Sequence, residues 1–167
     1  MKVHRLFGLL WPVLAMSNAT MAQAPPGAAA SRGTLEVDMT PLAKSYQSME
    51  IVAGFHNNCT GTKAKFRGSL RGGIPDGEGE LVPACDIPVD MSPYSVPESC
   101  SRCTTVKRWT GLFQAGNLPF GQVDTEAGWT YYGPLFNLLP HGSGVVTDPD
   151  GGVSRQRFAF GRRAETP

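Results

Sequence analysis

The sequence WTGLFQAG at residues 109–116 is the clearest copy of a pattern that recurs along the chain. The pattern is an aromatic residue, any residue, glycine, any residue, an apolar residue, two further residues and a second glycine. It also begins at Phe66 and at Tyr131, and Ser154 stands where a further copy would begin. The nearly equal steps from Trp109 to Tyr131 and on to Ser154 indicate a structural unit of about 22 residues.

The copies depart from the pattern at particular positions. Leu138 replaces the second glycine of the copy at Tyr131, and the copy at Ser154 lacks the aromatic residue but keeps Phe158 and Gly161. The step from Phe66 to Trp109 is about twice as long as the later ones. We therefore expect one copy to be replaced by an insert at about residues 83–106.

Each unit predicts two short strands that are joined by a glycine-rich turn. A Gly-x-Gly sequence begins eleven residues after Phe66 and again eleven residues after Tyr131, at Gly77 and Gly142. A single hairpin cannot bury its aromatic side chain alone, so neighbouring copies must stack. The expected fold is mainly β, a single meandering antiparallel sheet of stacked β-hairpin repeats with a short N-terminal helix that caps one end.

The repeat resembles MORN (membrane occupation and recognition nexus) repeats, which read Tyr-x-Gly-x-Phe-x-x-Gly, then Gly-x-Gly and Asp-Gly. The similarity begins at Phe66 and comprises three copies and a degenerate fourth one, with the N-terminal third and the insert outside it. It implies a curved sheet used for protein–protein contact, self-association or contact with acidic lipids, and it implies no chemistry. Because one fold serves many functions, function must be argued from a site.

The N-terminal third divides into three expected segments. Residues 1–22 have a basic start, an apolar run and small residues near their end, which is typical of a signal peptide. Residues 23–33 are rich in alanine and proline and are expected to form a flexible linker. Residues 34–58 should form a cap, with a strand at 34–39 and a helix that begins at Thr40-Pro41, ends near Gly54 and covers the first sheet edge. The repeat domain is then 59–163.

The charge balance argues against nucleic acid as a partner. Removal of residues 1–22 takes away Lys2 and Arg5, which reduces the 15 basic side chains to 13 against 14 acidic ones, a net charge of −1. Phosphate backbones are bound by strongly basic surfaces. We expect a periplasmic or secreted protein.

The four cysteines outside the signal segment are Cys59, Cys85, Cys100 and Cys103. In an exported chain, an even number of cysteines is most simply explained by two disulfides. Three pairings are possible, and a Cys85–Cys100 bridge across the insert is favoured because these cysteines bracket it. Two alternatives are a CxxC redox motif at Cys100–Cys103 and a zinc site made of His56, Cys59, Cys100 and Cys103.

Basic side chains recur at similar places in the units. Lys65 and Arg67 flank the inward Phe66, so they share the outer strand face, and Arg108 and Arg155 fall at or beside the same register. These four residues, Lys65, Arg67, Arg108 and Arg155, are the candidate binding ridge. It could contact an acidic protein or an anionic membrane surface, or simply pair with acidic residues on the neighbouring strands.

Catalytic motifs of the Gly-x-Ser-x-Gly, His-Glu-x-x-His and phosphate-loop types do not occur in the sequence. We therefore expect an exported non-enzymatic protein–protein interaction or scaffolding module of the cell envelope, without a cofactor or metal. The alternatives are an envelope thiol–disulfide enzyme that uses Cys100 and Cys103, and a protein that binds anionic membrane surfaces.

Overall fold

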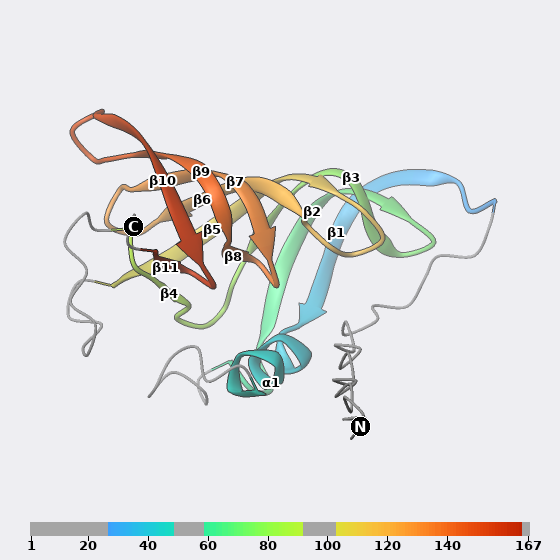
Figure 1. Cartoon of the computed structure of the whole chain (residues 1–167). Helices are drawn as coiled ribbons and strands as arrows, with labels where there is room; N and C mark the ends of the chain where they lie inside the picture. The colour runs from blue at the N-terminus through green and yellow to red at the C-terminus, as the bar shows by residue number, and fades with distance from the viewer. Residues whose placement is uncertain (1–26, 49–58, 92–102, 165–167) are drawn as a thin grey trace, which may run out of the picture.

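The computed structural model describes residues 27–48, 59–91 and 103–164. Within these ranges eleven strands form one open antiparallel sheet, and one helix lies against it (Figure 1). The main strand order is β1-β2-β3-β5-β6-β7-β9-β10-β11, and the short strands β4 and β8 pair with β5 and β7. The expected single meandering antiparallel sheet is confirmed. No helix in the described residues has the length and apolar character that a membrane crossing requires.

The elements follow the chain in order. They are β1 (Ala30–Asp38), α1 (Thr40–Ser48), β2 (Lys63–Arg71), β3 (Ile74–Val82), β4 (Pro88–Val89), β5 (Thr104–Phe113), β6 (Phe120–Thr125), β7 (Thr130–Phe136), β8 (Leu139–Pro140), β9 (Gly142–Thr147), β10 (Val153–Ala159) and β11 (Arg162–Arg163).

The aromatic residues of the repeat occupy one continuous row of the sheet. In this row each residue lies opposite the next on the neighbouring strand: Leu35, Phe66, Leu81, Trp109, Val123, Tyr131, Val146 and Ser154. The Phe66, Trp109 and Tyr131 side chains are fully buried on the inner face. The predicted common burial of the three aromatic residues is therefore confirmed. Ser154 ends the row, and Phe158 supplies the last buried ring, edge-on to Tyr131.

A row of glycines lies beside the aromatic row because the rings pack over it. The Phe66 ring occupies the space that a Cβ atom would need at Gly68 and Gly79, and Tyr131 does the same at Gly133 and Gly144. In the middle copy, Leu118 replaces the ring and packs over Gly111 and Gly121. The glycines of the repeat therefore make room for side chains of the core.

Four tight turns connect the paired strands at equivalent places of the units. In each turn, two successive residues have positive φ, as type I′ hairpin turns require: Gly72–Gly73, Ala115–Gly116, Asn137–Leu138 and Phe160–Gly161. Three of the four pairs end in glycine, which adopts this conformation without steric cost. The exception is Leu138, with φ of 65°.

The N-terminal segment differs from its prediction in two respects. Strand β1 begins at Ala30, so residues 30–33 of the expected linker belong to the sheet, where they pair with β2. Helix α1 starts at Thr40 as predicted and is described to Ser48, while its expected end near Gly54 lies outside the described residues. Among the described residues, α1 does not cover the first edge, because β1 itself forms that edge and α1 lies below the sheet (Figure 1).

The predicted Cys85–Cys100 bridge is wrong. Cys85 is bonded to Cys59, with their Cα atoms 5.1 Å apart. The reason is the pairing of β2 with β3, in which Lys65 lies opposite Val82, so the segment before β2 and the segment after β3 meet at one end of the hairpin. Cys103 is also disulfide-bonded, and Cys100 lies outside the described residues.

The predicted insert at 83–106 is partly integrated into the sheet. β5 begins at Thr104, inside the predicted range, and β4 pairs with its first residues. The side chains of Ile87, Val89 and Met91 are buried in the core. β3 pairs directly with β5, so the repeat order continues across the insert.

Candidate functional site

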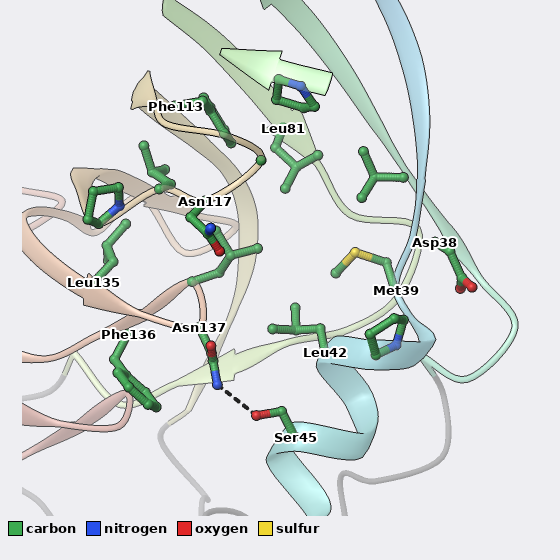
Figure 2. A pocket seen from close by; sticks show the side chains of 17 residues that line it. Asp38, Met39, Leu42, Ser45, Leu81, Phe113, Asn117, Leu135, Phe136 and Asn137 are labelled. Atoms are coloured by element: carbon green, nitrogen blue, oxygen red, sulfur yellow. Dashed lines mark hydrogen bonds between the residues drawn. The ribbon is translucent and has the colours of Figure 1, made fainter. Parts of the chain in front are cut away.

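A cavity of about 490 Å³ lies between α1 and the inner face of the sheet (Figure 2). Its walls come from the end of β1, from α1, and from the turns that follow β5 and β7. The lining is mainly apolar: Val37, Met39, Pro41, Leu42, Pro75, Leu81, Phe113, Leu118, Pro119, Leu135, Phe136 and Leu138. A volume of this size falls in the range of ligand-binding pockets, which are typically lined by apolar side chains with a few polar groups.

Four polar residues contribute to the cavity wall: Asp38, Ser45, Asn117 and Asn137. The Asn137 side-chain amide donates a hydrogen bond of 2.6 Å to Ser45 Oγ (Figure 2). This bond connects α1 to the turn after β7, so it holds the two sides of the cavity together. Figure 2 shows the carboxylate of Asp38 directed away from the cavity.

Asp38 fixes the start of α1. Its Oδ1 accepts a hydrogen bond of 2.9 Å from the backbone N–H of Thr40. Hydrogen bonds from the backbone and side chain of Thr40 lower the pKa of the Asp38 carboxyl below its usual value. Met39 follows Asp38, and its fully buried side chain forms part of the cavity wall. The cap therefore positions the helix against the cavity.

Leu138 brings an apolar side chain to the cavity from a strained backbone. A left-handed conformation costs an L-residue about 1–2 kcal/mol relative to a right-handed one. The Leu138 carbonyl accepts a hydrogen bond of 2.7 Å from Trp109 Nε1, which fixes the turn from beneath. A strained backbone conformation persists only where contacts with the surrounding residues enforce it. Such residues are concentrated at functional sites.

Tyr131 supports the other end of the same hairpin. Its hydroxyl donates to the carbonyl oxygen of Pro134 at 2.8 Å and, at 3.4 Å, to that of His141. Burial raises the pKa of Tyr131 to about 12, so its phenol remains a neutral donor at physiological pH. The β7–β8 hairpin is thus held by Trp109 and Tyr131, both from the aromatic row.

His141 occupies a structural position near this hairpin. Its Nδ1 accepts a hydrogen bond of 3.3 Å from the backbone N–H of Phe160, and its ring contacts those of Phe136 and Phe160. The imidazole is thus part of an aromatic cluster. His56, the histidine of the alternative zinc site, lies outside the described residues.

The structure does not bring the four residues of the candidate binding ridge together. Lys65 and Arg67 are neighbours on the outer face of β2, and Arg108 lies two strands away on β5. Arg155, on β10, is four strands beyond Arg108, which corresponds to about 19 Å at the usual strand spacing. The four side chains share the outer face without forming one cluster.

Arg108 is held between two carboxylates. Its Nε donates to Asp124 at 2.5 Å and its Nη1 to Glu80 at 3.4 Å. The hydrogen bond and the charge of Asp124 raise the pKa of Arg108 above its usual value. Among the described residues, none of the ion pairs involves Lys65, Arg67 or Arg155. Of the four ridge residues, Arg108 alone forms an ion pair with another described residue, while Lys65 and Arg67 lie opposite Glu36 and Glu80 on the neighbouring strands, as cross-strand charge pairing requires.

The disulfides bear on the two cysteine-based alternatives. The zinc site needs Cys59 as a thiolate ligand, but Cys59 is joined to Cys85. The redox alternative needs a lowered thiol pKa, which a helix N-terminus often provides. Cys103 is followed directly by strand β5 instead. Disulfides persist in oxidising compartments such as the periplasm and the extracellular space.

No pattern in the sequence predicts the cavity. Its walls come from segments far apart in the chain, and its lining residues look like ordinary core positions. One signal was present, because Leu138 replaces a glycine of the repeat and no packing argument from the sequence explains that replacement.

No protein-family model matches the chain, and no curated protein is significantly similar to it.

Proposed function

We propose that the protein is an exported, non-enzymatic interaction module that binds an apolar segment of a protein partner in the cavity beneath its sheet. The observation that carries the proposal is the cavity between α1 and the β7–β8 hairpin, with Leu138 in its wall. A glycine would relieve the backbone strain there. The Leu138 side chain packs against the core and forms part of the cavity wall, where it can also contact a bound partner.

The lining favours an uncharged apolar partner group. Leu42, Leu135 and Phe136 present hydrocarbon surface, and Asn117 and Asn137 provide amide groups beside it. Amides match the backbone of a bound peptide, while the apolar walls match one or two large side chains. The resemblance to MORN repeats supports the same class of function, protein–protein contact.

Export is part of the proposal. The signal-like residues 1–22 and the Cys59–Cys85 disulfide are both expected of a protein that folds in the periplasm or is secreted.

Peptide selection tests the proposal. A random peptide library is selected against the disulfide-bonded protein, and the enriched peptides are titrated against variants by fluorescence anisotropy. We expect peptides with large apolar residues, whose affinity falls about ten-fold or more in Leu138→Gly and Leu42→Asn, because each variant removes apolar contact area.

Leu112→Asn is the matched control. Leu112 is 55% exposed on the outer face, so this change removes an apolar side chain of the same kind away from the cavity. Equal peptide affinity for the cavity variants and the wild type would contradict the proposal, as would selected peptides that respond only to Leu112→Asn.

A further inference from the structure

The two edges of the sheet differ in their capacity to pair with another strand. At one end, β11 consists of two residues, Arg162 and Arg163, which pair with the end of β10, and the uncovered part of β10 carries Arg155 and Arg157. At the other end, β1 is nine residues long, and among the described residues it pairs with β2 alone. Short strands and positive charges discourage pairing at an edge.

β1 is a long and regular edge strand, and its charged side chains are of both signs. Its nine residues, ASRGTLEVD, include neither proline nor lysine, and its register with β2 runs without a bulge from Ala30 to Asp38. A regular edge of this length presents a row of backbone donors and acceptors that another strand can use. Leu35 and Val37 belong to the inner face but remain partly exposed at this edge.

The charges on β1 are symmetric about its centre. Thr34 is the middle residue of the strand, and Arg32 and Glu36 lie two residues before and after it, all on the outer face. If two copies of β1 pair antiparallel with full overlap, Thr34 lies opposite Thr34. Arg32 of each copy then lies opposite Glu36 of the other, and Leu35 lies opposite Gly33 on the inner face.

Both charged side chains can turn toward such a partner. Arg32 is 3.9 Å from Glu78, and their side chains are 81% and 82% exposed, so this contact is weak. Glu36 pairs with Lys63 at 3.2 Å, also at the solvent-exposed surface. Opposite charges directly across two strands stabilise the pairing, and like charges destabilise it.

We propose that a second copy of this chain pairs antiparallel along β1, about a two-fold axis at Thr34, so that two sheets continue as one. The occupant of the edge is the same strand of another molecule, because the register of full overlap is also the register in which the charges match. This inference rests on the edge of β1 and not on the cavity, which shares Val37 and Asp38 with that strand.

A disulfide trap tests the axis. Opposed residues of antiparallel strands have Cα atoms roughly 4.5–5.5 Å apart, within the range of a disulfide. We expect Thr34→Cys to form a covalent dimer on mild oxidation. The matched control is Thr110→Cys, a threonine on the outer face of the central strand β5, which should remain monomeric on a non-reducing gel.

Charge reversal tests the register. The two-fold axis creates the pair of residues 32 and 36 twice in the dimer. Either single variant, Arg32→Glu or Glu36→Arg, gives both of these pairs like charges. Each variant should therefore raise the dimer dissociation constant roughly ten-fold or more in sedimentation equilibrium. The double variant Arg32→Glu/Glu36→Arg restores opposite charges and should return the constant to near the wild-type value.

Three results would overturn the proposal. They are a wild-type monomer at every concentration, equal cross-linking of Thr34→Cys and Thr110→Cys, and a double variant that dissociates as readily as the single ones. Peptide binding in the cavity is measured separately, and its loss or retention leaves these results unaffected.

Discussion

Leu138 combines an unfavourable backbone conformation with a place in the cavity wall. The equivalent turns end in Gly73, Gly116 and Gly161, which have positive φ without a side chain to oppose it. Asn followed by Gly is a preferred pair for this type of turn, and Asn137 already provides the first residue. The leucine is therefore a local departure from the most stable sequence.

Leu138→Gly should increase the free energy of unfolding by about 0.5–1 kcal/mol, because relief of the strain exceeds the loss of a partly buried side chain. Urea denaturation measures this change. Gly73→Ala is the reverse test: its Cβ would meet nothing within 4 Å, so the expected loss of about 1 kcal/mol reports the positive φ alone. A Leu138→Gly variant less stable than the wild type would contradict the assignment of strain.

Gly79 shows how the repeat glycines act on the core. Its backbone conformation is open to other residues, but a Cβ there would collide with the Phe66 ring and lie 3.2 Å from the Arg67 carbonyl. Gly79→Ala should therefore lower the free energy of unfolding by about 2–3 kcal/mol through overpacking.

A double-mutant cycle separates this steric effect from a backbone effect. With Phe66→Leu in the background, the ring is absent and Gly79→Ala should cost clearly less. The measurement is urea denaturation of the four proteins of the cycle. Additive losses would show that the ring is not what excludes a side chain at Gly79.

At the scale of elements, the start of α1 depends on one charged cap. The pKa of Asp38 is lowered, so its carboxylate stabilises the folded state above the ordinary pKa of 3.8, and this contribution is lost as the pH falls through the lower folded-state pKa. Asp38→Ala should reduce stability at pH 7, and the difference from the wild type should shrink below about pH 4.

Urea denaturation at pH 7 and at pH 3 measures this dependence. Asp76→Ala is a suitable comparison, because Asp76 pairs with Arg71 within the β2–β3 hairpin and makes no helix cap. A stability difference for Asp38→Ala that is the same at both pH values would contradict the role of the charge.

The Cys59–Cys85 disulfide closes the β2–β3 hairpin. The two residues are 26 apart in sequence, and in the chain-entropy model a loop of this length contributes about 3–4 kcal/mol. The double variant Cys59→Ser/Cys85→Ser should lose an amount of this order. Measured under oxidising conditions by urea denaturation, a loss below about 1 kcal/mol would show that the closed loop matters little.

The elements could be predicted to different extents. Strand pairs and turns around Phe66, Trp109 and Tyr131 followed from local spacing, because period and turn chemistry act within one unit. The Cys59–Cys85 pairing and the start of β1 depend on which strands become neighbours, and no local pattern in the sequence states this. The start of α1 at Thr40 was predicted correctly from its capping sequence.

At the scale of the whole molecule, the candidate site was harder to predict than the fold. The cavity needs α1, the turn after β5 and the turn after β7 to meet, and Ser45 and Asn137, which join them, are 92 residues apart. The residues of the candidate binding ridge share one face of the sheet but do not form a cluster. A shared register places Arg108 and Arg155 on one face, but the number of strands between them sets their distance.

The unequal ends of the sheet also limit how large an assembly can become. A two-fold contact through β1 uses the same strand of both molecules and leaves two β11 ends pointing outward. Each of these ends is a two-residue strand of arginines. Growth into a fibril would require a further contact through the C-terminal edge, where β11 is short and Arg155 and Arg157 of β10 place positive charges, so the proposed pairing is expected to stop at a dimer.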